Sequence, residues 1–315
     1  MQTPKVSVII TTYNRAEFIG DTIKSVLTQT YQDFELIIID DGSTDNTKSI
    51  IDKFNDKRII YYYQDNKGQN PARNKGMELS NGDYIAHIDS DDTWKNTKLE
   101  KQVKILDKFK EIGLVYCGTK LIDSKGRFIR NLKIYDYNGF VLEQLIMFNF
   151  LYNGSNTLFR KSCLEKIECF DESIDRMTDW EFYLKFSIFY KFYCVPDYLV
   201  FYRIHDTNMS VNYKKYEKNG FKILYKVFKR VSVKNSIKHL KPLAYAMRYR
   251  FLAHRCLDLN SSKEIRKYVI KAFKICPSIL YKSNIALIFI LSFCSKWVLN
   301  ALRKSRKYTY NLNCK

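Results

Sequence analysis

Residues 84–92 read YIAHIDSDD, a continuous apolar run that ends in a cluster of carboxylates. Residues 35–43, ELIIIDDGS, repeat this pattern, and residues 6–15, VSVIITTYNR, also pass from an apolar run to polar side chains. Unbroken apolar runs of this length are typical of strands buried on both faces of a parallel sheet. A further run at residues 59–63, IIYYY, predicts a fourth strand.

The segments between these runs predict helices at residues 19–27, 44–54 and 71–79. Alternating strands and helices predict an α/β domain with right-handed crossovers. In open sheets of this kind, ligands bind beyond the carboxyl ends of the strands. The polar residues that follow each strand are therefore the candidate functional residues.

The composition excludes wholesale disorder, because 46% of the 315 residues are hydrophobic and 27% are charged. The net charge of +20 is concentrated in residues 211–315, which hold 25 Lys and Arg against three acidic residues. Residues 1–210 are nearly neutral. This asymmetry predicts a catalytic domain at 1–210 joined to a basic extension at 211–315, and it disfavours a nucleic-acid-binding body.

The eight cysteines include no CxxC pair and no Cys/His spacing suited to zinc. We therefore expect reduced, mostly packed thiols in a cytoplasmic protein. The N-terminal residues 1–14, MQTPKVSVIITTYN, lack a proper apolar region and a small-residue cleavage site, so we expect no secretory signal.

Two carboxylate clusters, Asp40–Asp41 and Asp89–Asp92, are expected to meet at one edge of the sheet. They would repel each other unless a cation or hydrogen-bond donors offset the charge. Mg²⁺ and similar hard cations bind through one or two carboxylates together with substrate phosphates. The alternative is that these residues cap helices or shape turns, and this alternative is strongest for Asp41 and Asp92.

Six segments together resemble glycosyltransferase family 2, the inverting transferases with the GT-A fold. They are VSVIITTYNR (6–15), IIIDDGSTDNT (37–47), NPARNKGMELSNGDYIAHIDSDD (70–92), NGSNTLFRKSCLEKIECFDES (153–173), TDWEFYLKF (178–186) and YRIHDTNMS (202–210). The resemblance covers about residues 4–210. It implies a Rossmann-like, mainly parallel sheet flanked by helices. It also implies a nucleotide-diphosphate-sugar donor, UDP-sugar favoured, and Mn²⁺ or Mg²⁺.

On the donor side, the resemblance assigns Thr11, Tyr13 and Asp40 to the base and ribose. A carboxylate at Asp40 suits this role, since it can accept the N–H of a uracil or guanine ring. Arg73 matches a position near the diphosphate, where a guanidinium pairs with phosphate oxygens. Asp89, the first residue of the DxD motif, is expected near the ribose and the metal.

The second aspartate of the motif, Asp91, matches a metal ligand, and His205 matches a position where some members supply another. Asp179 matches the catalytic base, which takes the proton of the acceptor hydroxyl. The family's Glu-Asp pair is Thr178-Asp179 here, so the base has lost one neighbouring carboxylate. Glu181 is the fallback base, with an ordinary helix-surface Glu as the alternative interpretation.

Acceptor recognition has weaker signals. Ser155 and Trp180 lie in segments that line the acceptor side in relatives, and an aromatic ring can stack on a sugar face. Trp180 suits a core position equally well. The expected acceptor is a hydroxyl of a glycan or lipid-linked glycan.

The basic extension predicts helices at residues 237–257, 261–275 and 285–302. The last is apolar with a narrow polar stripe and is followed by the basic cluster 303–307, a pattern typical of an interfacial helix. We therefore expect peripheral binding to an anionic membrane, at its inner face. The alternative is packing on the catalytic domain or a second subunit.

Two other classes remain open. A nucleotidyltransferase acting on a sugar phosphate shares the acidic nucleotide site but has no need for Asp179. A nucleic-acid-binding protein could use the basic extension, but this extension contains no recognisable binding module. We expect no nucleic-acid partner.

Overall fold

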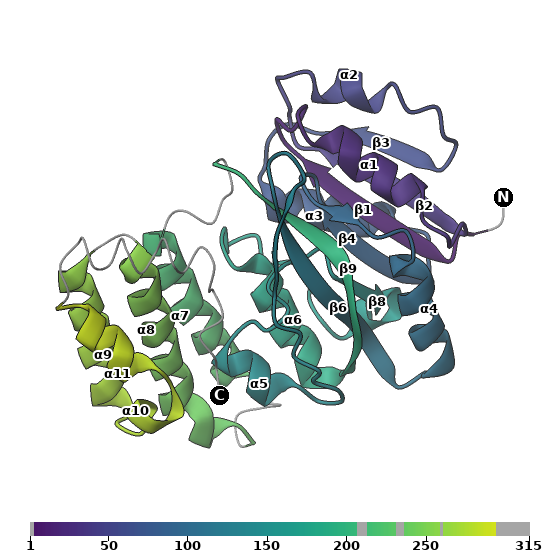
Figure 1. Ribbon diagram of the computed structural model, residues 1–315. Coiled ribbons are helices and arrows are strands. Elements are labelled where there is room, and N and C mark those ends of the chain that lie inside the picture. Colours follow the sequence, from purple (N-terminus) through teal and green to yellow (C-terminus); the bar gives the residue numbers. More distant parts are fainter. Residues whose placement is uncertain (1–2, 207–212, 231–235, 259–260, 294–315) are drawn as a thin grey trace. The chain divides into compact units, whose positions relative to one another are not determined.

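The structure is a computed structural model that describes residues 3–206, 213–230, 236–258 and 261–293 (Figure 1). The chain forms two compact units. The N-terminal unit comprises residues 1–142 and 150–208, and the C-terminal unit comprises residues 143–149 and 209–315. The sequence did not predict that the short segment 143–149 groups with the C-terminal part.

The N-terminal unit is built on a sheet of nine strands whose first half is parallel. Its strand order begins β3-β2-β1-β4. These strands are β1 (Val6–Thr12), β2 (Phe34–Asp40), β3 (Ile59–Tyr63) and β4 (Tyr84–Asp89). The connecting helices are α1 (Ile19–Leu27), α2 (Thr47–Ile51) and α3 (Gln69–Leu79). All four predicted strands are present, and α2 is shorter than predicted.

The second half of the sheet is mixed, and it continues from β4 in the order β8-β6-β9-β5, with β7 paired to β6. Strand β8 runs antiparallel to both β4 and β6, whereas β6 and β9 are parallel. The remaining elements are β5 (Thr93–Trp94), α4 (Lys98–Lys108), β6 (Ile112–Asp123), β7 (Phe128–Asn131), β8 (Thr157–Arg160), the 3₁₀ turn η1 (Lys161–Glu165), α6 (Thr178–Phe189) and β9 (Lys191–Ile204).

Burial explains why the apolar runs form central strands. All seven residues of β2 are buried. Helix α3 packs against β1 and β2, and α4 packs against β6, β8 and β9. This is the mainly parallel, helix-flanked GT-A sheet that the resemblance implied.

The strand register brings the carboxyl ends of β1, β2 and β4 to the same level in the sheet. Thr12 pairs with Asp40, and Thr11 pairs with Asp89. The loops after β1, β2 and β4 therefore begin at the same edge of the sheet, as predicted.

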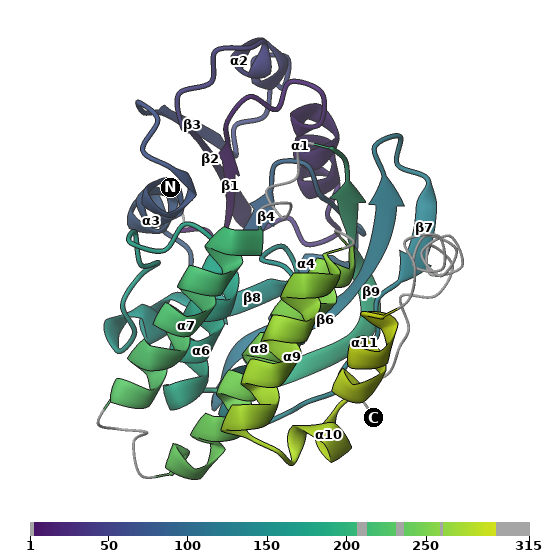
Figure 2. The same ribbon diagram turned by 90° about the vertical axis from the view of Figure 1, so that its left-hand side faces the viewer.

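The C-terminal unit is helical (Figure 2). Its elements are α5 (Leu142–Met147), α7 (Tyr213–Lys229), η3 (Lys238–Leu240), α8 (Lys241–Asp258), α9 (Ser262–Ile275), α10 (Ile279–Lys282) and α11 (Ile285–Leu291). The boundary between the units falls after Leu142, the first residue of α5. Helices α8 and α9 lie side by side and share one apolar core with α10 and α11.

The predicted helix at 285–302 is described as far as α11. Trp297 and the cluster 303–307 lie outside the described residues. Over the part of the chain that the structure describes, no helix has the length and apolar character needed to cross a bilayer.

Candidate active site

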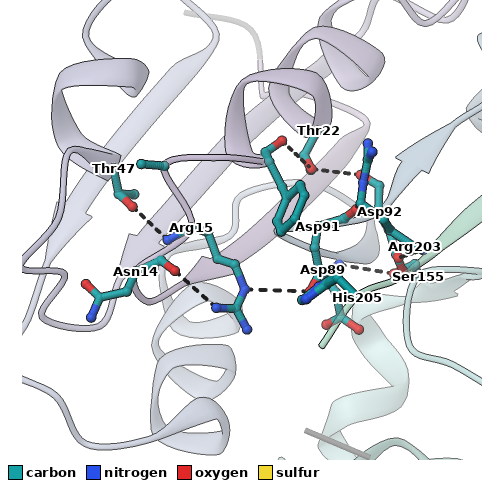
Figure 3. A network of polar contacts seen from close by, with 12 residues as sticks. Asn14, Arg15, Thr22, Thr47, Asp89, Asp91, Asp92, Ser155, Arg203 and His205 are labelled. Atoms are coloured by element: carbon teal, nitrogen blue, oxygen red, sulfur yellow. Dashed lines mark hydrogen bonds and ion pairs between the residues drawn. The ribbon is translucent and has the colours of Figure 1, made fainter. Parts of the chain in front are cut away.

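The turn after β4 places two aspartates beside cationic side chains (Figure 3). Asp89 Oδ1 accepts a hydrogen bond from Arg73 Nη2 at 2.7 Å. Asp91 Oδ2 lies 2.9 Å from His205 Nε2 and 3.6 Å from Arg15 Nε. Two arginines from other segments of the chain, Arg15 and Arg73, therefore offset part of the negative charge at this edge.

Asp92, the last residue of this turn, anchors it. Its carboxylate accepts the Ser155 hydroxyl at 2.6 Å and the Arg203 N–H at 3.0 Å, while its carbonyl accepts the Thr22 hydroxyl at 2.7 Å. Burial raises the pKa of Asp92 well above its ordinary value, and the neighbouring Asp91 and Asp89 carboxylates raise it further. Of the two interpretations, the turn-shaping role fits Asp92.

The turn after β2 is held differently. Asp40 accepts the Ser43 N–H and the Tyr61 hydroxyl, both at 2.9 Å. Burial, followed by the bond to Asp40, raises the pKa of Tyr61.

Asp41 binds the segment that leads into α3. It accepts the N–H groups of Lys67 and Gly68 at 2.9 and 2.8 Å and the Gln64 amide at 2.7 Å. This buried carboxylate therefore shapes a loop, in agreement with the alternative interpretation.

The loop after β1 is tied to the loop after β2. Asn14 has a positive φ of 50°, and its Oδ1 accepts the Thr44 N–H at 2.8 Å. Tyr13 next to it is 45% exposed, so its ring is accessible at the edge where Thr11 and Asp40 end their strands. These three predicted donor-side residues lie on neighbouring strand ends.

Arg73 connects the turn after β4 to the start of α6. Its side chain is 4% exposed, and it donates through Nη2 to Asp89 and through Nη1 to Thr178 Oγ1 at 2.9 Å. Arg73 and Asp179 line one small pocket. The other lining residues are His87, Gly154, Thr157, Phe159, Phe170, Phe182 and Tyr183.

Asp179 is partly exposed in the first turn of α6. Burial raises its pKa, the Arg73 guanidinium opposes this, and the Asp89 carboxylate adds to it. Met177 before it has a left-handed backbone with φ 62°, a strained conformation for a residue with a side chain. A strained turn thus sets where the α6 helix begins and where Asp179 lies.

Glu181 is a buried residue, which corrects its interpretation as a surface glutamate. It forms an ion pair with Lys185 at 3.1 Å, and both side chains are less than 10% exposed. A carboxylate held by a buried lysine is a poorer base than Asp179, so the fallback loses support.

The acceptor-side expectation for Ser155 and Trp180 finds no support in their burial. Ser155 is 0% exposed, and its hydroxyl contacts the backbone N–H of Asp89 and the carboxylate of Asp92. Trp180 is 3% exposed, which fits the core position that was equally compatible with the sequence.

Three residues at the site were missed or undervalued in the sequence. Arg15 contacts Asp91 as described above. Arg203 is buried and donates to the carbonyls of Asp91 and Ser124 and to Asp21 Oδ2. Its position beside His205 in YRIH was the available signal.

His87 is the third. Its side chain is 5% exposed and packs against the rings of Phe159 and Phe170. Neither ring nitrogen has a hydrogen-bond partner among the described residues. Burial, with Arg73 nearby, lowers the pKa of His87 to about 3.

Asp91 and His205 fit a hard or borderline cation through one carboxylate oxygen and one imidazole nitrogen. The described part of the chain contains no group of three His, Cys, Asp or Glu side chains arranged to hold a metal. The pair therefore fits a cation that takes its remaining ligands from water and substrate phosphates, and does not form a closed protein cage.

Sequence comparisons agree with this geometry. Residues 7–168 match the model of "Glycosyl transferase family 2". The chain is 34% identical over 217 residues to an uncharacterized glycosyltransferase of Rickettsia typhi, and the matched region covers 66% of this chain and 68% of that protein. It is 46% identical over 106 residues to the putative teichuronic acid biosynthesis glycosyltransferase TuaG of Bacillus subtilis, covering 33% and 42%. The nucleotidyltransferase alternative gains no support from these relatives.

Solved structures agree in fold. S. aureus TarS residues 1–349 with UDP-GlcNAc superpose with a TM-score of 0.58 at 17% identity, covering 96% of this chain and 92% of that chain. The mannosyltransferase PcManGT from Pyrobaculum calidifontis, with GDP-Man and Mn²⁺, gives 0.57 at 17% identity, covering 98% and 88%. Because the family model spans half of the chain and the fold agrees with it, the chain belongs to glycosyltransferase family 2 and is a glycosyltransferase of the GT-A fold.

Proposed function

We propose that this enzyme transfers a sugar, with inversion, from a nucleotide diphosphate sugar to a hydroxyl of a glycan or lipid-linked glycan. The observation that carries the proposal is the position of Arg73. One side chain bonds both Asp89, in the donor half of the site, and Thr178, which precedes the proposed base Asp179. The leaving group and the attacking hydroxyl would thus be held on the two sides of one guanidinium.

In the donor half, Thr11, Tyr13 and Asp40 would bind the base and ribose. The Asp40 carboxylate suits the ring N–H of uracil or guanine. We favour a UDP-sugar, and the GT-A neighbour TarS was solved with UDP-GlcNAc. Arg73 would contact the diphosphate, where a guanidinium forms bidentate, charge-assisted hydrogen bonds.

Asp91 and His205 would hold Mn²⁺ or Mg²⁺ together with the diphosphate. The cation would neutralise negative charge as the nucleoside diphosphate leaves. Arg73 would stabilise the same charge from the protein side. Because the leaving group is a stabilised diphosphate, no separate general acid is needed.

Asp179 would accept the proton of the acceptor hydroxyl. Its raised pKa makes it a stronger base than an ordinary aspartate, while Arg73 keeps the pKa from rising further. The position of Asp179 in the first turn of α6 also favours its ionised form, through the helix dipole.

Residues 1–210 would form the catalytic domain, and residues 211–315 would bind an anionic membrane at its cytoplasmic face. Helix α11, IALIFIL, supports this because only part of its apolar surface is buried, at Ile285, Ile288 and Leu291. Beyond its buried stripe, Leu287, Ile290 and Phe293 are 40%, 63% and 65% exposed. Exposed apolar side chains in a strongly basic segment are typical of interfacial binding. Failure of the full chain to sediment with anionic vesicles at low salt would refute this assignment.

The catalytic proposal is tested by measuring the release of UDP from UDP-sugars and of GDP from GDP-sugars, with Mn²⁺ and a bacterial lipid extract as acceptor source. We expect Asp179→Asn to lower release by about 10²–10⁴-fold, because it removes the proton acceptor and preserves shape. Calorimetry should show unchanged metal-dependent donor binding. Glu181→Gln is the matched control, since it removes a neighbouring carboxylate that already has a lysine partner. If Asp179→Asn retained full activity, Asp179 would not be the base.

A further inference from the structure

Asp91 faces an imidazole and a guanidinium, which differ in whether they can remain beside it when a metal binds. His205 can turn a nitrogen lone pair to a cation, but Arg15 has donors alone. The Arg15 guanidinium lies 3.6 Å from Asp91 Oδ2, through Nε, close to where a dication on that oxygen would be. Like charges at this separation repel each other, even near a protein surface. Arg15 and a metal therefore compete for Asp91.

The backbone of Arg15 is fixed, so the side chain is the part that can move. Its N–H donates to Thr47 Oγ1 at 2.9 Å, and the next residue, Ala16, donates to Asp45 Oδ2 at 3.1 Å. The side chain is 21% exposed, and its Nη1 donates a hydrogen bond to the carbonyl of the preceding residue, Asn14.

The other two arginines of the site are held more firmly. Arg73 and Arg203 are each 4% exposed. Arg203 donates through Nε, Nη1 and Nη2 to three separate segments, and Arg73 donates to two. Arg15 is thus the cation at this turn best placed to exchange its partner.

We propose that Arg15 is a displaceable counter-ion of Asp91, which leaves the carboxylate for the phosphate oxygens of an incoming diphosphate and so admits the metal. The inference rests on the proposed function, because it takes Asp91 as a metal ligand. With two protein ligands available, the metal would bind weakly alone. Arg15 makes that binding weaker still, and couples it to the diphosphate. The enzyme would therefore load metal together with its nucleotide.

The test measures Mn²⁺ binding by electron paramagnetic resonance of the free ion, on the full chain, with no anion, with pyrophosphate and with UDP or GDP. Pyrophosphate probes the phosphate contact without regard to the base. The variants are Arg15→Gln and Arg15→Lys, checked for folding by circular dichroism. Arg58→Gln is the matched control, because Arg58 is 20% exposed and pairs with Asp56 at 2.7 Å.

In the wild type we expect pyrophosphate to tighten Mn²⁺ binding at least about tenfold. In Arg15→Gln, Mn²⁺ alone should bind about three- to tenfold more tightly, while pyrophosphate alone binds more weakly, so the coupling falls. Arg15→Lys, which keeps the charge, should lie between, and Arg58→Gln should match the wild type.

The proposal would be overturned if Arg15→Gln, without anion, bound Mn²⁺ no more tightly than the wild type. It would also be overturned if Arg58→Gln bound Mn²⁺ as much more tightly as Arg15→Gln does. If the wild type bound no Mn²⁺ even with nucleotide diphosphate, metal assistance itself would fail, and with it the role of Arg15. The first result leaves the proposed function intact, so the two failures are distinguishable.

Discussion

The two aspartate turns of the sheet look alike in sequence but are stabilised by different chemistry. After β2, Asp40 and Asp41 accept bonds from backbone N–H groups, an amide and a tyrosine hydroxyl. After β4, Asp89 and Asp91 face arginine and histidine side chains. Backbone donors are part of the fold and stay in place, whereas charged side chains can exchange one partner for another.

This difference indicates that the two turns have different roles. Under the proposed function, the turn after β2, which is held by backbone donors, would be a rigid platform for the flat, neutral ring of the base. The turn after β4 holds its charge with groups that also bind phosphate or metal. A pair of acidic residues after a strand therefore says little until its partners are known.

The largest expected effect separates the two turns directly. We expect Asp91→Asn to weaken metal-dependent nucleotide diphosphate binding by about 10²-fold, because the amide supplies no charge for the cation. Calorimetry with UDP and GDP, with and without Mn²⁺, measures this. Asp41→Asn is the control, since Asp41 faces backbone donors. Equal losses in both variants would erase the distinction between the turns.

A smaller effect is expected on stability at the turn after β2. Asp41→Ala leaves the N–H groups of Lys67 and Gly68 without their acceptor, at a cost of about 1–3 kcal/mol. Thermal and urea unfolding measure this loss. A variant as stable as the wild type would show that solvent replaces the carboxylate, and that the platform is less rigid than inferred.

The smallest effect concerns pH. The proposed mechanism requires ionised Asp179, and burial raises the pKa of this residue. We therefore expect the activity to fall on acidification at a pH above the ordinary aspartate range of about 4. Arg73→Gln removes the charge that lowers this pKa, and the acid limb of kcat/KM should move to higher pH. If the acid limb of kcat/KM stayed at the same pH in Arg73→Gln, the Arg73 guanidinium would not act on the pKa of Asp179.

Much of the nucleotide-facing half was predictable because local patterns specify it. The four parallel strands and their polar ends follow from apolar runs and the rule on strand carboxyl ends. The helix predicted at residues 44–54 begins late, at Thr47, because Thr44 and Asp45 donate their N–H groups to Asn14. Such a contact between distant loops has no local signature.

The partners of the aspartates were less predictable. Arg203 reaches Asp92 across 111 residues and Asp21 across 182. Arg15 follows Asn14 in a segment whose pattern predicts a loop and gives no sign of Asp91. The burial of Ser155 and Trp180 was also not predictable, because sequence alone does not reveal which polar or aromatic side chains are buried.

Strand β9 has a practical consequence. The family match ends at residue 168, whereas Asp179 follows it, and β9 then carries Arg203 and leads to His205. A fragment trimmed to the matched region would keep the nucleotide-side motifs, yet it would lack the proposed base, one proposed metal ligand and the parallel partner of β6. When related chains are recombined or shortened, we expect the junction to preserve activity if it falls after Asp206.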